Sequence, residues 1–104
     1  MATTMYLNLP VKDLSASVAF FTQLGFRFNP LMTNEQGTCL IVSDTLFVML
    51  LEESFFQSFT GKPLVNAHQA NEFILCLSAD SRAEVDRMVD AALAAGGQPV
   101  PQQP

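Results

Sequence analysis

Positive charge is scarce in this sequence. Its 104 residues contain five lysines and arginines against ten aspartates and glutamates, so the formal net charge is −5. The basic residues are also scattered along the chain: Lys12, Arg27, Lys62, Arg82 and Arg87. A nucleic-acid surface needs clustered lysine and arginine to neutralise phosphates. We therefore expect no nucleic acid as a partner.

Histidine and cysteine are scarce as well, which limits metal and redox chemistry. The single histidine, His68, lies in a segment without regular pattern, where we expect an exposed side chain rather than an oriented general base. Cys39 and Cys76 each lie in an apolar run typical of a strand and have no C-x-x-C spacing. We predict buried free thiols in a reducing compartment, with a redox or metal role as the alternative.

Long apolar runs are missing. No stretch reaches the roughly 20 apolar residues of a membrane-spanning helix. Residues 1–4 lack the basic start and apolar core of a signal peptide. We therefore predict a cytoplasmic protein with no membrane partner.

The first half of the chain predicts one strand, one helix and then three strands. Residues 5–11 alternate as in a half-buried strand, whose odd positions should face a helix layer. A helix over residues 14–24 should begin at the cap Asp13 and stop at Gly25. The following strands are predicted as an edge or bent strand at 26–32, which contains Pro30, and a hairpin of residues 38–43 and 45–51.

The second half repeats the beginning of the first. A predicted strand at residues 72–78 leads into a helix whose capping box is Ser81 and Glu84 and whose stop is Gly96. The two strand-to-helix joints lie roughly 67 residues apart, which is typical of paired half-domains. We predict a single α+β domain, 1–104, with a first βαβββ module at 1–53, a linker at 54–70 containing a Phe-rich helical turn or two, and the start of a second, apparently incomplete module at 71–104.

This arrangement resembles the vicinal oxygen chelate superfamily, which comprises glyoxalases, bleomycin resistance proteins and extradiol dioxygenases built from paired βαβββ modules. It is most similar to the predicted lactoylglutathione lyase-like branch, in which a strand such as residues 45–52 is followed by a Phe-rich loop. The residues that carry the resemblance are 9–17, Phe20, Phe21, 24–26 and 79–97.

The resemblance also implies where a metal would bind. Metal-using members place His, Gln or Glu on the first strand of each module and a carboxylate on the last. The matching positions here are Tyr6, Leu50 and Ile74, none of which is a good donor for a divalent cation. We therefore expect no metal or other cofactor at the usual place, and a divalent metal at a shifted place as the alternative.

Oxygen-bearing side chains lie two residues along from these positions, at Asn8, Glu52 and Glu72. They would hold a ligand if they face the cup of the sheet, whereas solvated strand ends are the structural alternative. The predicted ligand pocket consists of Tyr6, Asn8, Leu50, Glu52, Glu72 and Ile74.

Apolar residues at the metal positions favour a small-molecule-binding protein of the glyoxalase/bleomycin-resistance type, with a small hydrophobic or carbonyl-containing ligand. The resemblance leaves two alternatives open. One is an enzyme, either a metal-dependent lyase of the lactoylglutathione lyase type or a dioxygenase. The other is a non-catalytic dimerising domain.

The apolar content predicts self-association. Apolar residues make up 49% of the chain and nine are phenylalanine, which is rich for a small soluble monomer. We expect a homodimer, to be checked by sedimentation of the full-length protein. A monomer at micromolar concentration would contradict this expectation.

Overall fold

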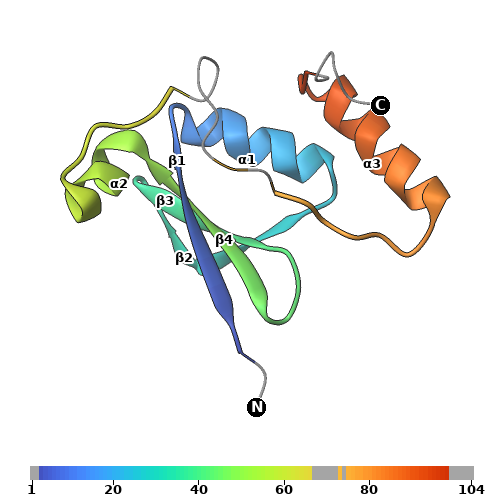
Figure 1. The fold of residues 1–104 in the computed structure, drawn as a ribbon, viewed down its shortest axis with the longest axis horizontal. Coiled ribbons are helices and arrows are strands. Elements are labelled where there is room, and N and C mark those ends of the chain that lie inside the picture. Colours follow the sequence, from blue (N-terminus) through green and yellow to red (C-terminus); the bar gives the residue numbers. More distant parts are fainter. Residues whose placement is uncertain (1–2, 67–72, 74, 99–104) are drawn as a thin grey trace.

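The computed structural model of the chain describes residues 3–66, 73 and 75–98. It is an α+β structure in which helices accompany a four-stranded mixed sheet (Figure 1). The elements of the described part are β1 (Met5–Val11), α1 (Leu14–Gln23), β2 (Arg27–Asn34), β3 (Gly37–Ile41), β4 (Leu46–Glu52), α2 (Glu53–Thr60) and α3 (Arg82–Ala94). None of these helices is long and apolar enough to cross a membrane.

The sheet confirms the predicted βαβββ order of the first module. Its strand order is β1-β4-β3-β2, with β1 parallel to β4 and the other pairs antiparallel. The two edge strands each contain a proline, Pro10 in β1 and Pro30 in β2. Proline has no N–H to donate to a strand ladder and is tolerated at edges. The predicted bend is also present, since the β2–β3 register shifts between Asn29 and Asn34.

Local backbone chemistry fixes both ends of α1 as the sequence predicts. The backbone N–H of Ala16 donates to Oδ1 of Asp13 over 3.1 Å, which caps the helix start. Gly25 adopts φ +98°, a left-handed conformation that suits a residue without Cβ. The N–H of Phe26 then donates to the carbonyl of Phe21 over 3.1 Å and that of Gly25 to Thr22 over 3.0 Å. This pair of bonds is a Schellman motif, which satisfies the last carbonyls of the helix.

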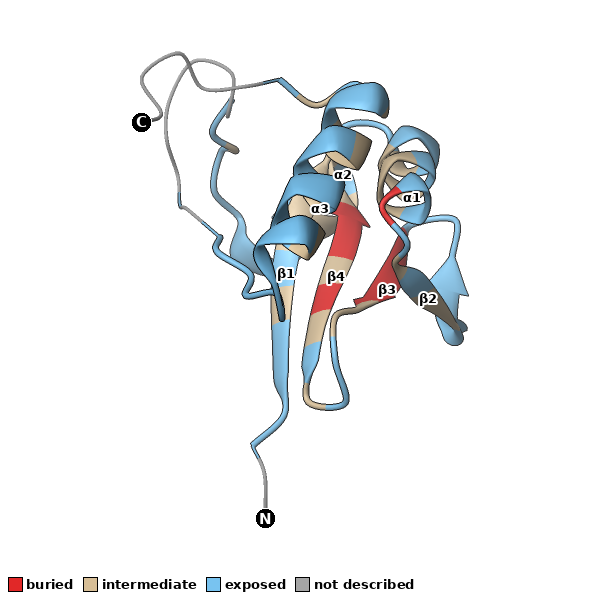
Figure 2. Ribbon diagram, turned by 90° about the vertical axis from the view of Figure 1, so that its right-hand side faces the viewer, coloured by how far each residue is buried: buried red, intermediate tan, exposed pale blue. Residues whose placement is uncertain are grey.

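The hydrophobic core lies between the sheet and α1. Its buried centre is Leu40, Val48 and Leu50, on β3 and β4 (Figure 2). The residues packed against this centre include Leu7, Leu9, Val11, Leu14 and Phe21. The odd positions of β1 therefore face the helix layer, as predicted.

For the second half of the chain, the predicted helix is confirmed and the predicted strand is wrong. The N–H of Glu84 donates to Oγ of Ser81 over 3.1 Å at the start of α3, and Gly96 adopts φ +104° just after its end. In contrast, Phe73 and residues 75–78 belong to no strand. A strand needs a neighbour for its backbone hydrogen bonds, and no described strand pairs with this segment. Glu72 and Ile74 of the predicted strand lie outside the described residues.

The linker predicted at 54–70 begins with regular structure. The expected helical turns are α2, which ends at Gly61 in a left-handed conformation, φ +68°. His68 and the rest of residues 67–72 lie outside the described part of the chain.

The two cysteines differ in exposure, so the prediction of buried thiols is right for Cys39 and wrong for Cys76. Cys39 lies in β3 with 0% exposure, and burial raises the pKa of its thiol above the ordinary value. Cys76 is exposed because its segment is not incorporated into a sheet. Both are free thiols.

Shortening Leu50 tests the position of the core. Leu50 is 1% exposed, so Leu50→Ala should lower the free energy of unfolding by about 3 kcal/mol through lost burial and a residual cavity. The matched control is Leu31→Ala at a side chain that is 94% exposed, with a change within about 0.5 kcal/mol. Urea unfolding of both variants measures the difference. Equal effects would contradict the assignment of the core.

Thiol labelling tests the difference between the cysteines. In the native protein a thiol-reactive disulfide reagent should modify Cys76 quickly and Cys39 only after unfolding, because the thiolate is the reactive form and Cys39 is buried and protonated. Cys76→Ser should abolish the fast phase, and Cys39→Ser is the control that retains it. A fast phase that survives Cys76→Ser would contradict the exposure assigned to the two cysteines.

Candidate functional site

The register between β1 and β4 decides which side chains share a face of the sheet. Tyr6 lies opposite Phe47, Asn8 opposite Met49, and Leu9 opposite Leu50. Residues directly opposite one another in neighbouring strands project to the same side. Since Leu9 and Leu50 both pack in the core, that face is covered by α1. The other face carries Tyr6 and Asn8 and lies away from α1.

The predicted ligand pocket is therefore brought together only in part. Tyr6 and Asn8 share the face away from α1, whereas Leu50 and Glu52 alternate onto the α1 side. Glu52 is half-buried and precedes α2 directly, where its side chain makes no capping hydrogen bond. Glu72 and Ile74 lie outside the described residues, so their place in a pocket stays a prediction.

Tyr6 and Asn8 have local partners on their strand and its neighbour. The Tyr6 ring stacks on Phe47, with ring centroids 5.0 Å apart and planes inclined by 15°. Nδ2 of Asn8 donates to the backbone carbonyl of Tyr6 over 3.2 Å. Tyr6 therefore contributes an aromatic surface to this face of the sheet. The second N–H of the Asn8 amide remains able to donate to another acceptor.

A hollow of about 390 Å³ lies beside Asn8, and we call it the α2 hollow. Its lining comes from β1, β4 and α2: Asn8, Leu51, Phe56, Phe59 and Thr60. Phe59 is 70% exposed, and its ring meets that of Phe55 edge to face with centroids 5.0 Å apart. Three apolar side chains with one amide and one hydroxyl suit an apolar ligand that carries a hydrogen-bonding group.

Sequence reasoning identified some of these residues and missed others. Asn8 was a predicted pocket residue and the Phe-rich segment was predicted as helical turns, whereas Leu51 and Thr60 were not singled out. Leu51 was missed because β4 is apolar on nearly every position, so no alternation marks which residues point away from the core. Thr60 is the last residue of α2, where its only sequence signal is the stop at Gly61.

The described residues do not supply the donor set that a family metal would need. Among them, no three His, Cys, Asp or Glu side chains lie close enough together to hold a metal ion. Of the positions that match the family ligands, Tyr6 is engaged with Phe47 and Leu50 is buried in the core. The lining of the α2 hollow in the described part of the chain consists of apolar side chains, one amide and one hydroxyl.

Comparisons with known proteins agree with this architecture. Residues 3–43 match the family model described as bleomycin resistance protein-like N-terminal. The hypothetical protein SA1046 from S. aureus has a solved structure similar to this one, with a TM-score of 0.76 and 28% sequence identity, covering 98% of this chain and 80% of that chain. The crystal structure of a glyoxalase/bleomycin resistance protein/dioxygenase family enzyme from Burkholderia phytofirmans PsJN is also similar, with a TM-score of 0.64 and 21% sequence identity. The match covers 91% of this chain and 74% of that chain. Among curated proteins no match was found.

The matched residues 3–43 span β1, α1, β2 and β3, which form most of the first module. The two solved structures extend the likeness across the α+β fold. The chain thus has a glyoxalase-like fold, and its residues 3–43 are similar to the N-terminal part of bleomycin resistance protein-like sequences.

Proposed function

We propose that this protein binds a small molecule in the α2 hollow without a metal ion. The observation that carries the proposal is the composition of the hollow, where Leu51, Phe56 and Phe59 surround the polar groups of Asn8 and Thr60. Its volume of about 390 Å³ lies within the range of small-molecule pockets. The likeness to bleomycin resistance proteins supports binding rather than a particular reaction.

The chemistry of the hollow favours a small hydrophobic ligand that contains a carbonyl group. The phenyl rings of Phe56 and Phe59 offer apolar surface for a planar body. The second N–H of Asn8 is a donor for a carbonyl oxygen. The Thr60 hydroxyl, which accepts from the Lys62 N–H over 3.4 Å, retains its own proton to donate.

An enzymatic role of the lactoylglutathione lyase type rests on the family resemblance alone. Such a lyase needs a metal or a charged group to stabilise an enediolate. The α2 hollow is lined by no acid, base or metal-ligand cluster within the described residues. Turnover of methylglyoxal and glutathione by the purified protein with added divalent metals would replace the binding proposal with this one.

The homodimer remains part of the proposal. Its support is a stripe of apolar side chains on α3, with Val85 46%, Val89 51% and Leu93 46% exposed. These residues recur every four positions and therefore lie along one side of the helix. A second copy of the chain would cover such a stripe.

Removing the Phe59 ring tests binding in the α2 hollow. The probe is prodan, a neutral naphthyl ketone whose emission reports an apolar environment. Wild-type protein should bind prodan saturably, and Phe59→Ala should weaken binding about fivefold because a partly covered ring contributes about 1 kcal/mol. Fluorescence titration measures both affinities.

Leu31→Ala is the matched control for this test. It also removes exposed apolar surface, but from β2 and outside the hollow, so its prodan affinity should equal that of the wild type. Phe59 is 70% exposed, so Phe59→Ala should fold normally. Absence of prodan binding, or equal affinity in Phe59→Ala and wild type, would overturn the proposal.

A further inference from the structure

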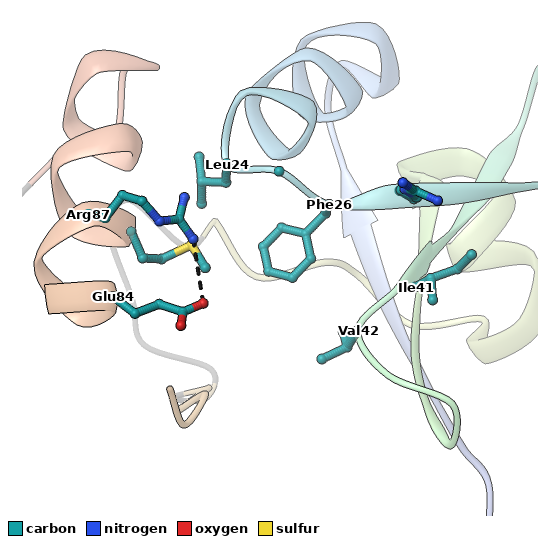
Figure 3. A pocket seen from close by; sticks show the side chains of 9 residues that line it. Leu24, Phe26, Ile41, Val42, Glu84 and Arg87 are labelled. Atoms are coloured by element: carbon teal, nitrogen blue, oxygen red, sulfur yellow. Dashed lines mark ion pairs between the residues drawn. The ribbon is translucent and has the colours of Figure 1, made fainter. Parts of the chain in front are cut away.

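A second hollow lies on the other side of the molecule, between the first module and α3. Its volume is about 350 Å³, and we call it the α3 groove. One wall is formed by the turn from α1 into β2 and by the end of β3, and the other by the first turns of α3. Figure 3 shows Phe26 and Val42 on one side of the open space, with Glu84 and Arg87 on the other.

The groove has an apolar base that is anchored in the core. Phe26 and Val42 both pack against the buried cluster of Leu40, Val48 and Leu50. Leu24 at the end of α1 is 7% exposed, and Met88 contributes a half-buried side chain from α3. An apolar molecule in the groove would therefore rest on side chains that pack against the core.

The rim of the groove carries positive charge in an otherwise acidic chain. Arg27 and Arg87 both line it, and they are two of only five basic residues in a chain of net charge −5. The acid that lines the groove is Glu84. Arg27 alternates in sequence with Phe26 and Phe28, which pack against the core, so its side chain projects from the opposite face of the sheet. The guanidinium that pairs with a carboxylate of the groove is therefore that of Arg87.

The ion pair within the groove is weak enough to exchange. The Arg87 Nη2 to Glu84 Oε1 distance is 3.6 Å, longer than the 2.7–2.9 Å of a charge-assisted hydrogen bond. The two side chains are 58% and 43% exposed, so water screens the pair. Arg27 has no ion pair with any described residue.

We propose that the α3 groove binds a small organic acid. Its carboxylate pairs with Arg87 in place of Glu84, and its apolar body lies against Phe26, Val42 and Met88. A guanidinium matches a carboxylate with two parallel hydrogen bonds, which gives the acid a defined orientation. This site does not depend on the α2 hollow, with which it shares no lining residue.

Phenylpropanoate and its neutral amide, phenylpropanamide, test the inference in wild-type protein. Backbone amide NMR should show saturable shifts at residues 24–27, 41–42 and 84–88 on addition of the acid. The amide has the same apolar body without the charge, so it should bind about fivefold more weakly. Equal affinity of acid and amide, no saturable shift, or shifts confined to α2 would overturn the proposal.

Charge variants provide the second arm. Arg87→Gln should weaken phenylpropanoate binding about fivefold, and Glu84→Gln should strengthen it about twofold because a competing carboxylate is removed. Arg82→Gln is the matched control, since Arg82 lies on the same helix and outside the groove. All three side chains are at the surface, so folding is preserved. If Arg82→Gln weakened phenylpropanoate binding as much as Arg87→Gln does, the effect would be one of overall charge, and the proposed site would be wrong.

Competition keeps the two proposals separate. Phenylpropanoate should not displace prodan, and Phe59→Ala should bind the acid as the wild type does, because Phe59 lies in the α2 hollow. Loss of acid binding in Phe59→Ala would assign the acid to the α2 hollow and overturn the α3 groove. Failure of prodan to bind would affect only the α2 hollow.

Discussion

The parallel pairing of β1 with β4 is the constraint on which the rest of the structure depends. It joins strands that are separated in sequence by α1 and a β-hairpin, and it places α1 over one face of the sheet. Leu50 and Leu51 are neighbours in β4 and both are buried, one in the core beneath α1 and the other beside α2. A strand covered on both faces fixes the positions of two helices at once.

Local signals in the sequence predicted local structure well, because their physical causes act within a few residues. Asp13, Gly25 and Ser81 each satisfy or redirect nearby backbone groups, and each marks the helix end that it predicted. Pairing across strands has no such local cause. Residues 73–77 are apolar at every position, as in a buried strand, but an apolar run alone supplies no partner for backbone hydrogen bonds.

The candidate site also divides into residues that local sequence signals could identify and residues that only strand pairing could identify. Asn8 could be selected from its own strand, since the alternation of β1 reveals its face. Leu50 was assigned to the same pocket from the ligand position of the resembled family, and β4 has too little alternation to show that Leu50 faces α1. A shift of one residue in a strand exchanges its two faces, so only the pairing register with β1 places Leu51 on the same face of the sheet as Asn8. The α3 groove requires α1, β2, β3 and α3 together and had no sequence signal of its own.

The prolines of the edge strands affect how copies of this chain meet at high concentration. A sheet edge with an unbroken row of N–H and C=O groups can recruit further strands indefinitely and seed fibrils. Pro10 in β1 and Pro30 in β2 each remove one donor from an edge, and the irregular register near Pro30 twists the second edge further from a flat template. Growth of the sheet into an open-ended filament is therefore disfavoured at both edges, which directs self-association toward closed assemblies that use side-chain surfaces.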